Sequence, residues 1–223
     1  MLKLQQITLN NITKLKFKIS LGLLIAFYSF GIAGILTNNQ TIDFLSLTPL
    51  NLIVNLFLLL INHQNGTKIQ WVIFGCIAMF GFFLEVIGVN TGYIFGDYVY
   101  ESTLGWKLFN TPLIIGINWL ILSYAVVYTI SGCINQKIIT AFLGACVLLL
   151  LDILIEPVAM NYGFWTWNNN TVPLKNYVAW FCISFFLCYI ISLFKGESKN
   201  KLATYLLILQ FIFFGIFNFV IWK

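Results

Sequence analysis

The chain alternates between long apolar stretches and short polar connections. Seven stretches reach or approach the length of about 17–25 residues that a helix needs to cross a bilayer. They are Phe17–Leu36, Leu45–Ile61, Ile69–Val89, Pro112–Ile130, Ile138–Ile155, Leu174–Phe194 and Leu202–Trp222. The pattern predicts a single all-α domain over residues 1–223. We expect a polytopic membrane helix bundle with about seven transmembrane helices.

The composition fits a protein surrounded by lipid. Hydrophobic residues make up 60% of the 223 residues and charged residues only 9%, whereas a soluble domain carries about 25% charged residues. All twelve cationic side chains are lysines, and Arg is the residue preferred for bidentate phosphate contacts. Because the lysines are also scattered along the chain, we expect the lipid bilayer as a partner and no nucleic acid.

The lysines predict an orientation. If the N-terminus is inside, nine of the twelve lysines fall on the inner side, as the positive-inside rule requires. The prediction is a multi-pass protein of the cell membrane with a cytoplasmic N-terminus and, for seven spans, a C-terminus outside. The second stretch is short and contains Asn51 and Asn55, so a re-entrant segment there is an open alternative.

The seven acidic residues are the informative feature, because Glu85 and Asp152 fall within predicted spans and Glu156 directly follows one, within the same depth of the membrane. A rise of 1.5 Å per residue places them about 21–27 Å above the inner ends of their spans, near the outer boundary. Asp97 lies in the outer connection that follows. A carboxyl inside a membrane helix costs about 2.5–3.5 kcal/mol on insertion and by default marks a functional site. The alternative is a purely architectural pairing with lysines of the outer connections.

A repeat relates two of these acids. Segments 85–92 and 156–163 share Glu, Asn and Gly at identical spacing, and downstream of each a Pro precedes a Trp by seven residues, in Pro112–Trp119 and Pro173–Trp180. The match predicts repeated two-helix hairpins at approximately 69–130 and 138–194 that insert with the same polarity. Such repeats can place equivalent groups, here Glu85 and Glu156, around one cavity. Pro157 is expected to break or kink its helix.

The residues around the acids favour proton chemistry. Aromatic residues surround them in the sequence, and aromatic faces attract cations. The single histidine, His63, lies in a short connection without nearby cysteines; we expect a solvated loop residue, no metal and no cofactor. Carboxyls in an apolar site favour the neutral acid, which is a proton donor. Protonation of an alkene would give a tertiary carbocation that carboxylates stabilise, followed by addition of water or loss of a proton.

The same residues resemble a known family, the carotenoid biosynthesis protein family. The resemblance rests on Leu84–Tyr93, Phe95–Tyr100, Leu104–Gly105, Pro112, Trp119, Asp152, Glu156–Val158, Gly163–Trp167 and Pro173–Trp180. It covers most of the chain from the third span to the sixth, and the first two spans match only loosely. The family includes CruF-type carotenoid 1,2-hydratases and bisanhydrobacterioruberin hydratases. The resemblance implies addition of water across the C1,C2 double bond of an acyclic carotenoid ψ-end, giving a tertiary 1-hydroxy carotenoid without a redox cofactor.

From the implied activity we expect the following partners and residue roles. The partners would be a membrane-dissolved acyclic carotenoid, water and other carotenoid-pathway enzymes. Asp152 or Glu156 would protonate C2, and Glu85 or Asp97 would orient and deprotonate the water. The expected substrate-binding residues, of which Trp165, Trp167 and Tyr93 would flank the cation, are Tyr93, Asn90, Trp119, Asn161, Trp165, Trp167 and Trp180. A proton-coupled membrane transporter and a non-catalytic scaffold subunit of a carotenoid enzyme complex are the alternatives.

Overall fold

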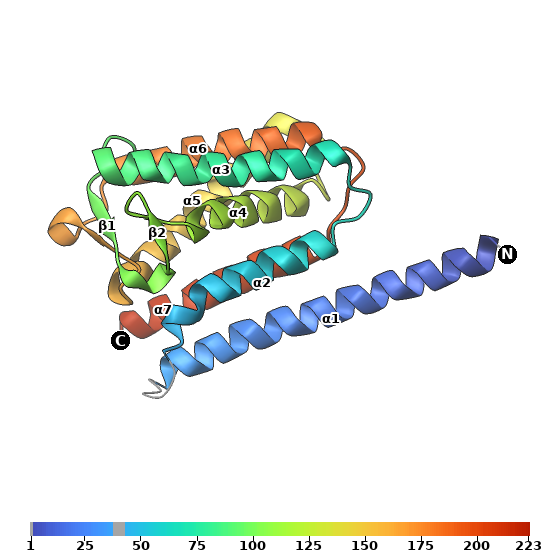
Figure 1. The fold of residues 1–223 in the computed structure, drawn as a ribbon, viewed down its shortest axis with the longest axis horizontal. Coiled ribbons are helices and arrows are strands. Elements are labelled where there is room, and N and C mark those ends of the chain that lie inside the picture. The colour runs from blue at the N-terminus through green and yellow to red at the C-terminus, as the bar shows by residue number, and fades with distance from the viewer. Residues whose placement is uncertain (1, 38–42) are drawn as a thin grey trace.

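The computed structural model describes residues 2–37 and 43–223, with side chains from residue 11 onward, and this part of the chain contains seven α-helices (Figure 1). They are α1 (Leu2–Leu36), α2 (Thr48–Ile61), α3 (Lys68–Thr91), α4 (Ile114–Ile130), α5 (Lys137–Asn161), α6 (Leu174–Phe194) and α7 (Leu202–Ile221). Successive helices run back and forth between the two ends of the bundle. The predicted all-α class is confirmed.

Five helices are long and apolar enough to cross a membrane. Their spans are Asn11–Leu36, Lys68–Thr91, Lys137–Asn161, Leu174–Phe194 and Leu202–Ile221. The two remaining apolar helices are shorter: Ile114–Ile130 forms α4, and Leu45–Ile61 combines a 3₁₀ turn, η1 (Leu45–Leu47), with α2. Each of the seven apolar stretches read from the sequence is therefore helical.

Helix α4 is the centre of the bundle. It is apolar on every side, as expected for a helix that faces no solvent, and the run from Trp119 to Tyr128 is buried throughout. It packs against α2, α3, α5, α6 and α7. Glycine permits the closest approach, because a Cβ on Gly116 would lie 2.3 Å from the carbonyl oxygen of Ala78 on α3. Small residues allow membrane helices to pack this closely.

Short strands close one end of the bundle, on the left in Figure 1. Strand β1 (Tyr98–Tyr100), from the α3–α4 connection, pairs antiparallel with β4 (Trp165–Trp167), from the α5–α6 connection. Strands β2 (Lys107–Leu108) and β3 (Thr111–Pro112) form a hairpin, and 3₁₀ turns occupy η2 (Ser102–Leu104) and η3 (Asn168–Asn170). The β1–β4 pair joins the connections of the two predicted hairpins.

Pro157 was expected to break or kink its helix. The helix does not break there, because α5 continues through the proline to Asn161. Proline removes a single backbone donor, the one that would serve the carbonyl of Ile153. Neighbouring helices can satisfy backbone groups freed in this way. The Asn218 side chain of α7 donates to the adjacent carbonyl of Leu154 at 2.7 Å. Glu156 therefore lies on a continuous helix and not in a loop.

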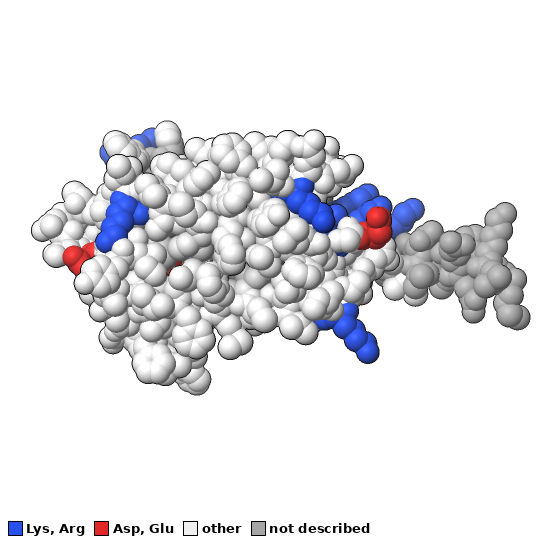
Figure 2. Space-filling view, turned by 90° about the horizontal axis from the view of Figure 1, so that it is seen from above, with Lys and Arg blue, Asp and Glu red and all other residues white. Residues whose placement is uncertain are grey.

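The charged side chains gather toward the two ends of the bundle, with a broad uncharged band between them on the face that Figure 2 shows. The connections at 62–67, 131–136 and 195–201 share one end, and the β1–β4 pair lies at the other. A lipid-exposed band between charged rims is the arrangement that membrane helices require.

His63 is not the solvated loop residue that the sequence suggested. Its Nδ1 lies 2.7 Å from the Tyr124 hydroxyl and its Nε2 lies 3.1 Å from Oε1 of Gln70. Gln70 Nε2 donates in turn to the carbonyls of Phe194 (2.8 Å) and Lys195 (2.6 Å) at the end of α6. The half-buried ring is thus held in a network that joins the α2–α3 and α6–α7 connections, which a local sequence window does not reveal.

Burial lowers the pKa of His63 below its ordinary value, and the weaker effect of the Gln70 hydrogen bond opposes this. The unfolded chain then binds more protons than the folded one, so stability is complete above about pH 6.5 and falls as the pH drops below that value. We expect NMR of the single imidazole in detergent micelles to give a pKa below 6.5. A His63→Asn variant should lose the acid-dependent part of the thermal-melting shift. A pKa at or above the free value would contradict this assignment.

Candidate active site

Three carboxyl side chains are buried near the strand end of the bundle: Glu85 on α3, and Asp152 and Glu156 on α5. Their exposed fractions are 4%, 0% and 2%. Charged residues are almost never this buried without partners, so the donors around them define the site.

Glu85 receives three hydrogen bonds from aromatic side chains. Trp119 Nε1 donates to Oε1 at 2.9 Å, and the hydroxyls of Tyr98 and Tyr100 donate to Oε2 at 2.5 and 2.9 Å. Side chains alternate along a strand, so Tyr98 and Tyr100 of β1 point inward while Val99 is exposed. This alternation brings two hydroxyls to a single carboxyl oxygen.

Glu156 receives three hydrogen bonds in the same manner. The indole nitrogens of Trp165 and Trp167 donate to Oε2 at 3.0 and 2.7 Å. Asn176 Nδ2, from the first turn of α6, donates to Oε1 at 3.1 Å. Strand β4 thus serves Glu156 as β1 serves Glu85.

The pairing of the strands relates the two sets of donors. In the antiparallel register Tyr98 lies opposite Trp167, and Tyr100 lies opposite Trp165. The rings of Tyr98 and Trp167 are 4.8 Å apart between centroids. Two short strands therefore present four aromatic side chains on one face, two to each glutamate.

The two copies differ one helical turn earlier. Asp152 precedes Glu156 by four residues, and its Oδ2 accepts from Asn176 Nδ2 at 3.0 Å. The corresponding residue before Glu85 is Gly81, where an added Cβ would lie 2.7 Å from Cβ of Trp119. In the first copy the side chain of Trp119 fills the space above Gly81, whereas the second copy has the carboxyl of Asp152 at the equivalent position. Only the second copy holds a carboxyl pair bridged by one amide.

The donors to these carboxyls are neutral throughout the described part of the chain. Lys107 Nζ donates to the carbonyl of Tyr100, and Lys175 Nζ donates to the carbonyl of Gly92 at 2.8 Å. Neither lysine is a counter-ion of the cluster. Asp152 Oδ1 is buried and has no hydrogen-bond partner among the described residues. A purely architectural pairing of the acids with these lysines is therefore not what the structure contains.

Tyr98 and Tyr100 remain donors at any physiological pH. Burial raises the pKa of both hydroxyls well above the ordinary value, and the negative charge of Glu85 raises it further. Neither residue was among the expected site residues, although the alternation of Tyr98, Val99 and Tyr100 could have indicated an inward-facing pair. Asn176 was also missed, because its counterpart in the repeat is Ile115, which carries no polar group.

Several expected site residues lie outside this cluster. Asp97 is exposed and its side chain lies beside Gly92, while its carbonyl accepts from the amide of Asn168 at 2.9 Å. Tyr93 is 80% exposed. Asn90 and Asn161 are also exposed. Each follows its glutamate by five residues, a rotation of about 140° around the helix, so they face away from the carboxyls.

Asn90 has contacts of its own. Its Nδ2 donates to the carbonyl of Phe109 at 2.9 Å, in the turn between β2 and β3, so it holds that hairpin against α3. Trp119 and Trp180, expected from the repeat, are both buried, and their tilted rings pack with centroids 4.3 Å apart. Trp119, Trp165 and Trp167 are thus the expected aromatic residues that contact a carboxyl.

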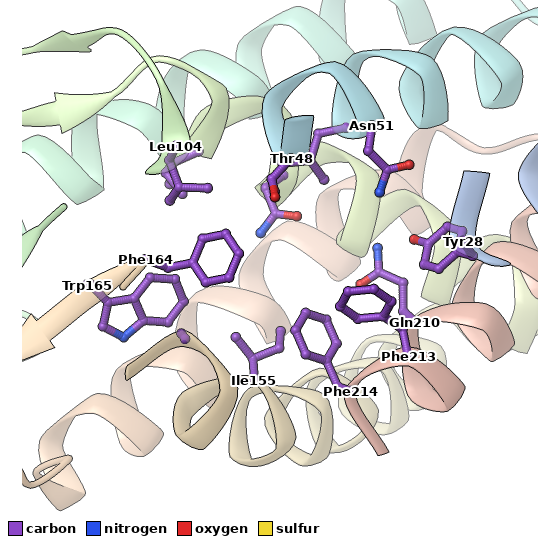
Figure 3. A pocket seen from close by; sticks show the side chains of 14 residues that line it. Tyr28, Thr48, Asn51, Leu104, Ile155, Phe164, Trp165, Gln210, Phe213 and Phe214 are labelled. Atoms are coloured by element: carbon purple, nitrogen blue, oxygen red, sulfur yellow. The ribbon is translucent and has the colours of Figure 1, made fainter. Parts of the chain in front are cut away.

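An apolar pocket begins beside Trp165, and we call it the indole pocket (Figure 3). The pocket and the open space at its mouth together span about 730 Å³. Trp165, Phe164 and Leu104 border one end, and Tyr28 and Asn51 border the other. Because Trp165 also donates to Glu156, a single indole ring separates the pocket from the carboxyl.

The site offers no evident metal cluster. Within residues 11–37 and 43–223, no group of three or more His, Cys, Asp or Glu side chains lies close enough to share one ion.

The comparisons with known proteins identify the family. No curated protein and no solved structure matches the chain. Residues 47–223 match the model of a carotenoid biosynthesis protein family, which extends the expected match to include the second and seventh apolar stretches. This match covers both repeated hairpins and every carboxyl of the site, and the chain therefore belongs to the carotenoid biosynthesis protein family.

Proposed function

We propose that the protein is a carotenoid 1,2-hydratase, which adds water to the C1,C2 double bond of an acyclic carotenoid ψ-end. The observation that carries the proposal is the set of three buried carboxyls that have neutral donors only, one of which, Glu156, contacts the indole ring of Trp165 that lines an apolar pocket. Proton transfer from a positioned carboxyl is a recognised catalytic contribution. Membership of the carotenoid biosynthesis family supplies the substrate class.

The carboxyl pair of α5 is the proposed proton carrier. Asp152 and Glu156 share the amide of Asn176, and Asp152 Oδ1 has no partner among the described residues, which suits an oxygen that carries the transferred proton. The proton moves to C2, the double bond supplies the electron pair of the new C–H bond, and a tertiary cation remains at C1. Water then adds to C1, and the ionised pair takes up the proton that the water loses. The net change is addition of one water.

Glu85 stabilises the cation in this scheme. Its three donors suit an ionised acceptor, and a fixed negative charge favours a cationic intermediate in a water-poor site. Of the two acids expected to handle the water, Glu85 lies within the cluster and Asp97 lies outside it. The faces of Trp165 and Trp167 provide cation–π stabilisation. Because Trp165 lines the pocket and donates to Glu156, access of the double bond to the acid requires this ring to move in the proposed scheme.

Amide substitutions test the acids. We expect Glu156→Gln, Asp152→Asn and Glu85→Gln each to reduce hydration at least about 100-fold, the usual contribution of a general acid. The measurement is the ratio of hydroxylated to unmodified pigment in lycopene-accumulating cells that express the chain alone. Glu197→Gln, the same change at an exposed residue of the other end, is the matched control. Full conversion by all three variants would remove the acids from the mechanism.

Solvent isotope labelling tests whether the hydrogen added to C2 comes from the solvent. In D2O, addition of a solvent-derived proton to C2 leaves one deuterium that does not wash out in H2O, whereas the hydroxyl deuterium does. We therefore expect the product mass to rise by one unit after back-exchange. A transporter or scaffold subunit would give no labelled product, and an oxidative hydroxylation would leave C2 unlabelled.

Asn176 is expected to act as a positioning residue. Asn176→Ala removes the amide that holds Asp152 and Glu156 together, and the loss of hydrogen bonds to charged groups typically costs about 1.5–3 kcal/mol each. We expect a slower reaction whose pH–rate profile in proteoliposomes is displaced from that of the unmodified protein. Asn168→Ala, an exposed residue of the same connection, should leave both unchanged. An Asn176→Ala profile of unaltered shape would assign the residue to folding alone.

A further inference from the structure

A second cavity continues the indole pocket toward the lipid face of the bundle. It lies between α1 and α2 and shares four lining residues with the indole pocket, namely Tyr28, Thr48, Asn51 and Phe213. We call this second cavity the portal groove. The two cavities therefore adjoin each other along these four side chains.

The far side of the portal groove opens where a membrane protein meets lipid. Among its lining residues, Phe30 is 71% exposed and Leu50 is 50% exposed. These side chains lie on α1 and α2 within the apolar spans. An apolar molecule dissolved in the bilayer would meet this opening without crossing a polar surface.

Helix α1 forms one wall of the groove. It packs against α7 and α2 and lies at the edge of the bundle, with its N-terminal part extending beyond the other helices (Figure 1). It precedes the segment that matches the family, which begins at residue 47. The wall of the groove is therefore a part of the chain that the family match does not explain.

We infer that the portal groove and the indole pocket form a lateral channel that takes one end of a long linear apolar molecule out of the bilayer. The tip of the molecule lies against Trp165 beside Glu156, and the remainder passes Phe213 and Tyr28 and stays in the groove and the lipid. The identification of this molecule as an acyclic carotenoid rests on the proposed function. The channel itself rests on the adjacency of the two cavities along four shared side chains and on their apolar walls.

Polar side chains in the channel provide hydrogen-bonding groups for water, the second reactant of the proposed hydration. The indole pocket includes Thr48, Asn51, Asn118 and Gln210 among otherwise apolar lining residues, and Asn51 Oδ1 is buried without a hydrogen-bond partner in the described chain. A buried water needs two to four polar partners. These amides and the hydroxyl give water a binding place inside the indole pocket, alongside the apolar chain.

A plug in the groove tests the channel. A Cβ added to Gly31, a lining residue of the groove, would lie 3.8 Å from the ring of Phe213. Because Phe213 lines both cavities, the side chain of Gly31→Leu projects into the groove close to the indole pocket. Gly22 lies on the same helix, is exposed and has no atom within 4 Å of an added Cβ, so Gly22→Leu is the matched control. Ala26→Phe, in the groove, and Ala33→Phe, outside it, form a second pair.

Each variant is made both in the unmodified protein, to measure conversion, and with Glu156→Gln, to measure the carotenoid that co-purifies from lycopene-accumulating cells. The folded fraction is checked by size-exclusion chromatography. We expect Gly31→Leu and Ala26→Phe to lower retained pigment and conversion about tenfold or more. Gly22→Leu and Ala33→Phe should match the parent protein in both measurements.

The outcomes separate the two ideas. Equal retention and conversion in plug and control variants would overturn the channel while the proposed hydration stands. Loss of pigment confined to the plug variants, in cells where no variant makes hydroxylated product, would support the channel and reject hydration. If no pigment co-purifies, conversion alone decides, and a complete lack of both pigment and product would overturn the channel.

Discussion

A carboxyl in the apolar interior of a helix bundle has to obtain its hydrogen bonds from the protein, because little water is present to solvate it. Burying an ionised carboxyl costs several kcal/mol, and each hydrogen bond to a charged group returns about 1.5–3 kcal/mol, so three donors are of the size required. Glu85 and Glu156 each receive three. Five of these six donors are aromatic side chains, four of them placed by the pairing of β1 with β4. The strand pair at the end of the bundle is thus the condition for two buried glutamates on different helices.

The repeat explains why the site is built twice, and its asymmetry explains how one half can act differently from the other. Both halves carry a glutamate and an aromatic strand. Only the second half adds Asp152 and Asn176, whereas the first has Gly81 and Ile115 at the corresponding positions, and the space above Gly81 is filled by Trp119. One carboxyl is thereby fixed by three donors, and a second site holds two carboxyls around one amide. Such a division separates a group that stabilises charge from a pair that can exchange a proton.

The fold was predictable because its signal is local. A stretch of apolar residues needs only its own length to be recognised, and all seven were found with ends that differ from the helices by few residues, apart from α1 and α5. The extension of α5 past Pro157 was not evident from the sequence, and α7 contacts the helix there through Asn218, which donates to the carbonyl of Leu154 next to the one that the proline leaves without a donor. His63 was misjudged for the same kind of reason, since its partners Tyr124 and Gln70 come from α4 and α3. Contacts between elements distant in the chain leave no mark in a single window.

The amino-acid sequence by itself determined the class of the protein, the family and the three acids that the structure buries, because hydropathy and the spacing of repeated residues are properties of the chain in one dimension. It could not tell which of the predicted acids are buried together and which are exposed. Asp97 was grouped with the buried carboxyls although it is exposed, and Tyr98, Tyr100 and Asn176 were passed over. Only the tertiary structure decided these points, since donor and acceptor are brought together by strand pairing and helix packing across 9 to 34 residues of chain. The pocket beside Trp165, whose walls come from five of the helices, likewise exists only once the bundle is assembled.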